Sequence, residues 1–97
     1  MLSRIFYMYV YLLTPRQKQV ARLVSHGYTN QEIAKKLFIE PNVVSWHLTP
    51  VYSELRNALE KKETDRMSRA LLAHWLTRLF EAYPDLNVND ESEDAQT

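Results

Sequence analysis

The sequence predicts a single small all-α domain built around four helices. Its 97 residues suffice for one ordinary domain and are too few for two. Hydrophobic residues make up 45% of the chain and charged residues 25%, which is the balance of a folded globular protein. A single glycine, Gly27, is too few for the many tight turns of an all-β domain. The absence of cysteine excludes disulfides, thiol catalysis and cysteine zinc sites.

Residues 1–13 form an apolar, aromatic-rich N-terminal arm in which only Arg4 is charged. Their tyrosine, valine and isoleucine content favours a strand or an extended arm, and one or two helical turns are the alternative. The apolar run is too short to cross a bilayer and carries no signal-peptide cleavage site, so we expect a cytoplasmic protein. Because exposed aromatic rings promote aggregation, the arm is expected to pack against its own domain or against a partner.

The predicted helical domain spans residues 14–84, and its first helix covers residues 14–26. Thr14 is a favourable N-cap, and Gln17 completes a capping box in which each side chain bonds the backbone N–H of the other residue. Gly27 follows as the expected C-terminal stop, because glycine readily adopts the left-handed conformation that ends many helices.

The second helix opens with another capping box, formed by Thr29 and Glu32, and is predicted to end near residues 38–39. The third helix begins at Pro41, since proline is favoured in the first turn of a helix. Apolar residues recur in it at spacings of three and four, which defines one inward face: Val44, Leu48, Val51 and Leu55. Pro50 lies inside this helix, and we expect a bend there because proline has no backbone N–H to donate.

A fourth helix is predicted from residues 64–65 to Pro84, with more apolar positions than one face can bury. The expected inward stripe is Met67, Leu71, Trp75 and Leu79. The remaining strip is expected to form a dimer contact: Leu72, Leu76, Phe80 and Tyr83. We therefore predict a homodimer through this helix, the alternative being that the N-terminal arm covers the strip within the same chain.

Charge is unevenly distributed along the chain. Residues 85–97 hold five of the twelve acidic side chains and few apolar ones, which predicts a disordered acidic tail. Residues 1–84 carry 12 basic and 7 acidic side chains, and this moderately basic body is compatible with a nucleic-acid partner. No metal, cofactor or enzymatic activity is predicted. The acidic residues form no isolated pair of the kind used in acid–base catalysis, and the three histidines share no metal-ligand spacing. These histidines are His26, His47 and His74.

Two short helices joined by a tight turn, the second opening with small exposed residues, are typical of a helix-turn-helix. The segment from Leu13 to Asn57 closely resembles the LuxR/GerE-type DNA-binding domain of bacterial transcription regulators. The resemblance is carried by Leu13-Thr14-Pro15-Arg16, Gln19-Val20, Gly27, Thr29-Asn30, Glu32-Ile33-Ala34, Leu37-Phe38-Ile39, Pro41, Val44, His47-Leu48, Tyr52 and Leu55. It implies a four-helix domain whose third helix is the recognition helix and whose fourth helix often dimerises.

The resemblance also implies that the partner is duplex DNA, contacted by two groups of residues. The candidates for facing the major groove are Asn42, Val43, Ser45, Trp46 and Thr49. The candidates for lying near phosphates are Thr29, Asn30 and Lys36.

The predicted recognition helix departs from the family pattern because it contains no Lys or Arg between Glu40 and Glu54. DNA affinity depends largely on cations that neutralise phosphates. Two functions therefore stay open. The chain is either a stand-alone LuxR-type regulator that binds DNA as a dimer, with weak specificity and few phosphate contacts, or a protein-binding antagonist or adaptor. In the second case Val43, Trp46 and Pro50 would form the contact strip, with Trp46 as an anchor for the partner. The alternative for Trp46 is a structural role in which its ring lies flat over a neighbouring helix.

Overall fold

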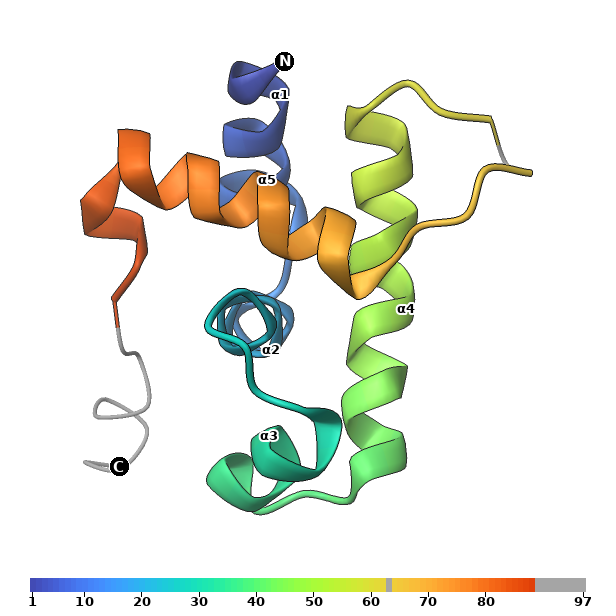
Figure 1. The fold of residues 1–97 in the computed structure, drawn as a ribbon, viewed down its shortest axis with the longest axis vertical. Helices are drawn as coiled ribbons and strands as arrows, with labels where there is room; N and C mark the ends of the chain where they lie inside the picture. The colour runs from blue at the N-terminus through green and yellow to red at the C-terminus, as the bar shows by residue number, and fades with distance from the viewer. Residues whose placement is uncertain (63, 89–97) are drawn as a thin grey trace.

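The computed structural model describes residues 1–62 and 64–88, and within these ranges the only regular elements are helices (Figure 1). The elements are α1 (Leu2–Tyr7), a π-helical turn η1 (Met8–Leu12), α2 (Pro15–Ser25), α3 (Asn30–Leu37), α4 (Pro41–Ala58), α5 (Arg69–Ala82) and a 3-10 turn η2 (Pro84–Leu86). The prediction of an all-α fold with four helices between residues 14 and 83 is confirmed.

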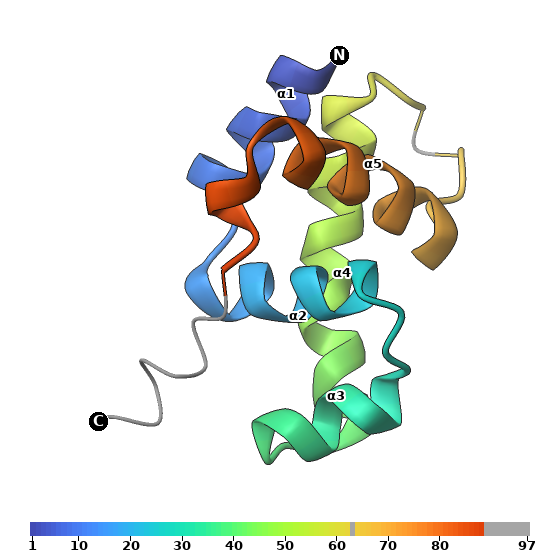
Figure 2. The same ribbon diagram turned by 60° about the vertical axis from the view of Figure 1, so that its left-hand side comes forward.

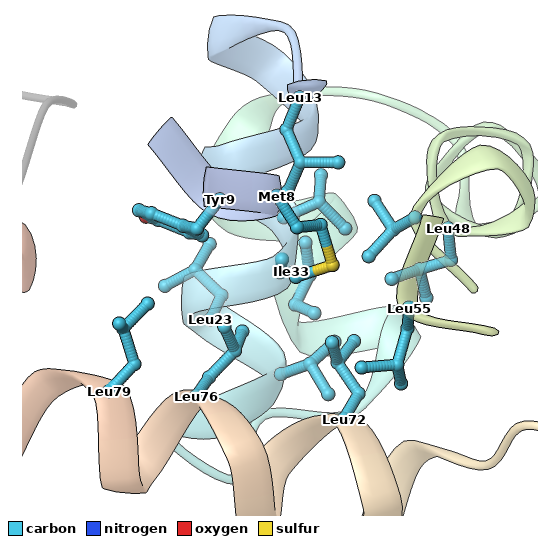
Figure 3. Close-up of a cluster of buried hydrophobic side chains, with 14 of the residues drawn as sticks. Met8, Tyr9, Leu13, Leu23, Ile33, Leu48, Leu55, Leu72, Leu76 and Leu79 are labelled. Carbon is cyan, nitrogen blue, oxygen red and sulfur yellow. The ribbon is translucent and has the colours of Figure 1, made fainter. Parts of the chain in front are cut away.

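Helix α2 lies at the centre of the molecule and packs against both α4 and α5, while α3 packs against the N-terminal half of α4 (Figure 2). Helix α1 packs on α5 at the opposite end from α3. Their inward side chains form one continuous apolar core (Figure 3). The inward face predicted for the third helix is confirmed, since Val44, Leu48, Val51 and Leu55 are all buried.

Both predicted capping boxes are present. The Gln17 N–H donates to Thr14 Oγ1 at 3.2 Å, and the Thr14 N–H donates to Gln17 Oε1 at 2.9 Å. Likewise the Glu32 N–H donates to Thr29 Oγ1 at 3.1 Å, and the Thr29 N–H donates to Glu32 Oε1 at 2.8 Å. These reciprocal bonds satisfy donors that the first turn of each helix would otherwise leave unpaired, and they fix where α2 and α3 begin. Gly27 ends α2 with a φ of +92°.

The preference for a strand or an extended N-terminal arm is wrong, because residues 2–12 are helical. Ile5, Met8 and Tyr9 recur at helical spacing, and all three are buried. Propensity for strands mostly reflects packing context, and here the available partners are the helices α4 and α5. Of the two packings left open by the sequence, the arm adopts the one on its own domain.

The last helix differs from the prediction in its start and in its orientation. It begins at Arg69, capped by Ser68, and not near residues 64–65. Leu72 and Leu76 are fully buried and Phe80 nearly so, whereas the stripe expected to face inward is partly exposed, apart from its buried member Leu79. The partly exposed members of that stripe are Met67, Leu71 and Trp75.

The physical reason for this orientation is that two elements cover α5 at once. Besides α2, the N-terminal helices supply aromatic rings to the end of α5: Tyr9 meets Phe80 edge-to-face at 5.4 Å between ring centroids, and Phe6 meets Tyr83 at 4.7 Å. The alternative in which the arm covers this strip within the same chain is therefore the observed one.

The C-terminal segment is ordered slightly beyond the predicted end of the domain. Leu86 packs partly against the core, and the Oδ1 atom of Asn87 lies 2.8 Å from the His26 Nε2 atom. The predicted disordered tail otherwise falls on residues 89–97, which lie outside the described residues.

Helix α4 spans Pro50 as one element and ends at Ala58.

Candidate nucleic-acid interface

The predicted recognition helix presents a continuous exposed face. Asn42, Ser45, Trp46 and Thr49 are exposed, and Val43 is half-buried. Because the inward residues of α4 pack on α2 and α3, these side chains lie on the side of the helix away from the core. The arrangement is that of a helix braced by its predecessor, with its N-terminal half free to enter a groove.

Two large apolar side chains stand out on this part of the surface. Trp46 is 76% exposed, as its register in α4 predicted, so it does not lie flat over a neighbouring helix. Phe38, which the sequence reasoning did not single out, is 94% exposed at the end of α3. Its backbone is left-handed, with a φ of 58°, and the following N–H of Ile39 donates to the Ala34 carbonyl oxygen at 3.0 Å. The turn geometry therefore directs this ring into solvent.

Hydrogen bonds tie the two helices of the candidate interface together. The Nδ2 atom of Asn30 donates to Ser45 Oγ at 3.1 Å and so joins α3 to α4. Within α4, the hydroxyl of Thr49 donates to the Ser45 carbonyl oxygen at 3.1 Å. The Oδ1 atom of Asn30 accepts from Arg69 Nη1. Asn30, expected near a phosphate, thus serves first as a bridge between α3, α4 and α5.

The remaining expected phosphate neighbours lie at the two ends of α3. Thr29 is exposed, with its hydroxyl capping the helix. Lys36 is exposed, and its Nζ atom lies 4.6 Å from the centroid of the Tyr28 ring. This cation–π contact holds the ammonium group beside the turn between α2 and α3.

Arg69 has a bridging role that sequence reasoning missed, since the sequence suggested only a DNA-backbone contact or a solvated helix end for Lys61, Lys62, Arg66 and Arg69. Its side chain reaches from the first turn of α5 to Asn30 and to the carbonyl oxygen of Tyr28, 41 residues away in the sequence. Neither helical periodicity nor a local motif signals a contact over such a separation. A basic residue at the start of a helix, where the helix dipole disfavours positive charge, is the one available hint.

The electrostatic environment of α4 includes one perturbed histidine. Burial of the His47 ring, together with the nearby Arg16 guanidinium, holds the pKa of His47 below its ordinary value of 6.5. The imidazole is therefore neutral at neutral pH and adds no positive charge to the face. Arg16 itself donates from Nη1 to Gln19 Oε1 at 3.0 Å.

Over the described ranges, no group of three His, Asp or Glu side chains is arranged to hold a metal ion. In the same ranges, no helix has the length and apolar character needed to cross a membrane.

Comparison with known proteins gives one family match. The family described as bacterial regulatory proteins, luxR family, matches residues 11–60, which include α2, α3 and α4. Among solved structures, none matches this chain.

Several curated relatives are named as regulators. A Mycobacterium bovis protein named as an HTH-type transcriptional regulator is 46% identical over 57 residues, covering 59% of this chain and 6% of the relative. The regulator AlkS of Alcanivorax borkumensis is 43% identical over 44 residues, or 45% of this chain and 5% of AlkS. The transcriptional regulatory protein LiaR of Bacillus subtilis is 36% identical over 62 residues, or 64% of this chain and 26% of LiaR. This chain thus spans a small fraction of the relatives it matches.

Proposed function

Since the chain belongs to the luxR family of bacterial regulatory proteins, we propose that it is a transcription regulator that binds duplex DNA through α3 and α4. The observation that carries this proposal is the exposed outer face of the first half of α4, which α3 braces from behind. A helix presented in this way fits the major groove of B-DNA. The names of the relatives, which are transcriptional regulators, support the same assignment.

The proposed contacts divide by chemistry. Asn42, Ser45 and Thr49 offer amide and hydroxyl groups to base edges, and the Trp46 ring and Val43 offer apolar contact to thymine methyl groups. Thr29 and Lys36 lie at the ends of α3, where they would meet phosphates on the flanking strand. Asn30 would contribute by holding Ser45 in place.

Selection of bound duplexes from a random-sequence pool tests this function. We expect enrichment of a preferred sequence, and weaker binding of that sequence by the Asn42→Ala/Thr49→Ala variant. Thr77→Ala, an exposed position on α5, is the matched control and should bind as the unaltered chain does. Failure of the unaltered chain to retain any duplex at low salt would overturn the proposal.

We also propose that two copies associate, although not through the strip expected from the sequence. Three members of that strip, Leu72, Leu76 and Phe80, are buried, and its fourth member, Tyr83, is 43% exposed and packs against Phe6. By contrast, the side chains of the N-terminal helices include three that are 56%, 67% and 44% exposed: Tyr7, Tyr11 and Leu12. Tyr7 and Leu12 line an apolar groove of about 270 Å³ between the N-terminal helices and α4, with Arg4 on one wall and Glu54 on the other. The Tyr11 ring packs against Tyr7, with 5.2 Å between the ring centroids. In a two-fold contact, Arg4 of each copy would face Glu54 of the other.

The size of this surface predicts a weak dimer. Half-exposed aromatic and aliphatic side chains contribute about 100 Å² each, so two copies would bury well under the 1,200–2,000 Å² that is typical of a stable interface. Sedimentation over a concentration series should show a monomer–dimer equilibrium that Tyr11→Glu shifts to monomer. A monomer at every concentration would refute this contact.

Protein binding through the same face of α4 is the second candidate function, and the exposure of Trp46 favours it. Tryptophan is enriched among residues that dominate protein interfaces, and Val43 and Pro50 flank it on adjacent turns. Because the Trp46 side chain is largely exposed, Trp46→Ala should lower the free energy of unfolding by less than about 1 kcal/mol. Truncation of a buried tryptophan would cost about 3–5 kcal/mol. Thermal melting measures this cost, and capture from bacterial extract compares the two chains. Loss of a captured protein with duplex binding unchanged would favour this second function.

A further inference from the structure

A cleft of about 350 Å³ lies between the second half of α4 and the segment that leads to α5. Thr49, Ser53 and Arg56 line it from α4, and Thr64 and Arg66 line it from the segment. In Figure 1 this segment leaves α4 on the side away from α2, and so on the outer side of the recognition helix. Thr49 belongs both to the cleft lining and to the exposed candidate face of α4, so the cleft adjoins that face.

The cleft continues the candidate DNA-binding face. Ser45, Thr49, Ser53 and Arg56 follow one another at spacings of four, four and three residues, which aligns them along one side of α4. The rise of an α-helix places Arg56 about 16 Å beyond Ser45. The side of α4 that carries these hydroxyl groups therefore continues to Arg56, the first cationic residue on that side of the helix.

Of the charged residues that line the cleft, two are cationic and one, Asp65, is anionic. The Nε atom of Arg56 donates to the Asp65 carbonyl oxygen at 3.2 Å, which fixes the guanidinium against the segment. The carboxylate of Asp65, also in the cleft lining, accepts the Lys62 N–H at 3.0 Å and so stabilises the turn. Arg66 supplies a second guanidinium in the cleft, and Lys62 is exposed nearby.

The nearest acidic side chains of α4 and its end serve other surfaces. Glu54 lines the groove beside the N-terminal helices, not this cleft. Glu60 forms an ion pair with Arg4 at 3.3 Å. Neither carboxylate therefore competes for the Arg56 guanidinium.

We propose that this cleft binds a phosphate group of the DNA backbone and supplies the positive charge that the first half of α4 lacks. Guanidinium groups match phosphate geometry, and neighbouring hydroxyls donate to the remaining phosphate oxygens. The proposal rests on the proposed DNA-binding function and identifies where the backbone contact lies. It differs from the expectation of few phosphate contacts, because Arg56 and Arg66 lie outside the stretch from Glu40 to Glu54 that contains no Lys or Arg.

The salt dependence of duplex binding tests the proposal. Affinity of a short mixed-sequence duplex is measured by fluorescence anisotropy over a series of salt concentrations for Arg56→Gln, Arg66→Gln and the double variant. Each lost phosphate contact should reduce the log–log slope by about 0.9. The exposed Arg78 on α5 provides the matched control, and Arg78→Gln should leave the slope unchanged.

Two further comparisons separate a phosphate contact from a structural effect. Arg56→Lys keeps the charge while altering the bond to Asp65, so it should keep most of the slope that Arg56→Gln loses. In nuclear magnetic resonance titrations, the amide signals of Ser53 and Thr64 should shift with duplex but not with inorganic phosphate at equal ionic strength. Equal shifts with inorganic phosphate, together with an unchanged duplex affinity in the double variant, would overturn the assignment to DNA.

The outcomes also distinguish this inference from the function on which it rests. Duplex binding by the unaltered chain with an unchanged slope in the double variant would overturn the inference alone. Absence of duplex binding by the unaltered, folded chain would overturn the proposed function and the inference with it.

Discussion

The Nη2 atom of Arg69 donates to the carbonyl oxygen of Tyr28 at 2.6 Å, joining the first turn of α5 to the turn that precedes α3. The same guanidinium donates from Nη1 to the Asn30 side chain, which in turn donates to Ser45 on α4. One side chain of α5 therefore helps to position α3 and α4 relative to each other.

Replacing Arg69 by glutamine should weaken this connection. Hydrogen bonds to a charged group contribute about 1.5–3 kcal/mol, so we expect Arg69→Gln to lower the free energy of unfolding by about 2 kcal/mol in urea titrations. Arg78→Gln, at an exposed position of the same helix, should change it by less than about 0.5 kcal/mol. Equal stability of the two variants would contradict a structural role for Arg69.

The beginnings of α2 and α3 could be predicted from the sequence, whereas the start of α5 was expected near residues 64–65 and lies at Arg69. Thr14 and Thr29 start α2 and α3 because a capping box is a local interaction between residues three apart. Gly27 likewise marks the end of α2. The ends of α3 and α4 carry no such signal, since Phe38 and Glu60 adopt the left-handed conformation without being glycine, with φ values of 58° and 57°.

The N-terminal arm and α5 could not be placed from local pattern, because each determines the face that the other buries. Tyr9 and Phe80 are 71 residues apart in the sequence yet meet in one aromatic pair. The width of the apolar arc on α5 indicated that two partners cover it, and the second partner is the arm. The exposed part of the candidate site was easier to predict, because the inward register of α4 alone places Trp46 in solvent.

Leu76→Glu is expected to unfold the domain, in contrast to the soluble helical monomer that a dimer-contact position would give. Leu76 is fully buried, truncation of such a residue costs about 2–5 kcal/mol, and an unpaired buried charge adds to that cost. Circular dichroism should show loss of helix, whereas Thr77→Glu, at the exposed neighbouring position, should remain helical. A folded Leu76→Glu variant would mean that this side chain faces outward.

Phe38→Gly should stabilise the chain. A left-handed conformation costs a non-glycine residue about 1–2 kcal/mol, and the 94% exposure of Phe38 means that little packing is lost with its ring. After the entropy cost of glycine is subtracted, we expect a gain of about 0.5–1 kcal/mol and a melting temperature higher by a few degrees.

Lys35→Gly provides the matched comparison for this gain. Lys35 is exposed within the same helix, where glycine should destabilise by about 1 kcal/mol. Similar losses of stability in both variants would show that the left-handed turn at Phe38 carries no strain.

Stability should depend on pH through His47. Its folded-state pKa lies below 6.5 because the ring is partly buried and Arg16 is close, whereas the unfolded chain has the ordinary value. Between these two pKa values the unfolded chain binds more protons, so the free energy of unfolding falls as the pH drops below about 6.5. Above that pH the contribution is fully retained.

Urea titrations over a pH series compare the free energy of unfolding of the unaltered chain with that of His47→Gln. As the pH falls below about 6.5, the unaltered chain should lose stability relative to His47→Gln. Nuclear magnetic resonance titration of the ring reads the pKa directly, and Arg16→Gln should raise it because one of its two causes is removed. A His47 pKa at or above 6.5 in the unaltered chain would contradict the prediction. Because the His47 ring is neutral at neutral pH, it adds positive charge to α4 only in acid. Duplex affinity should therefore rise as the pH falls and His47 becomes protonated. This rise should be absent from His47→Gln.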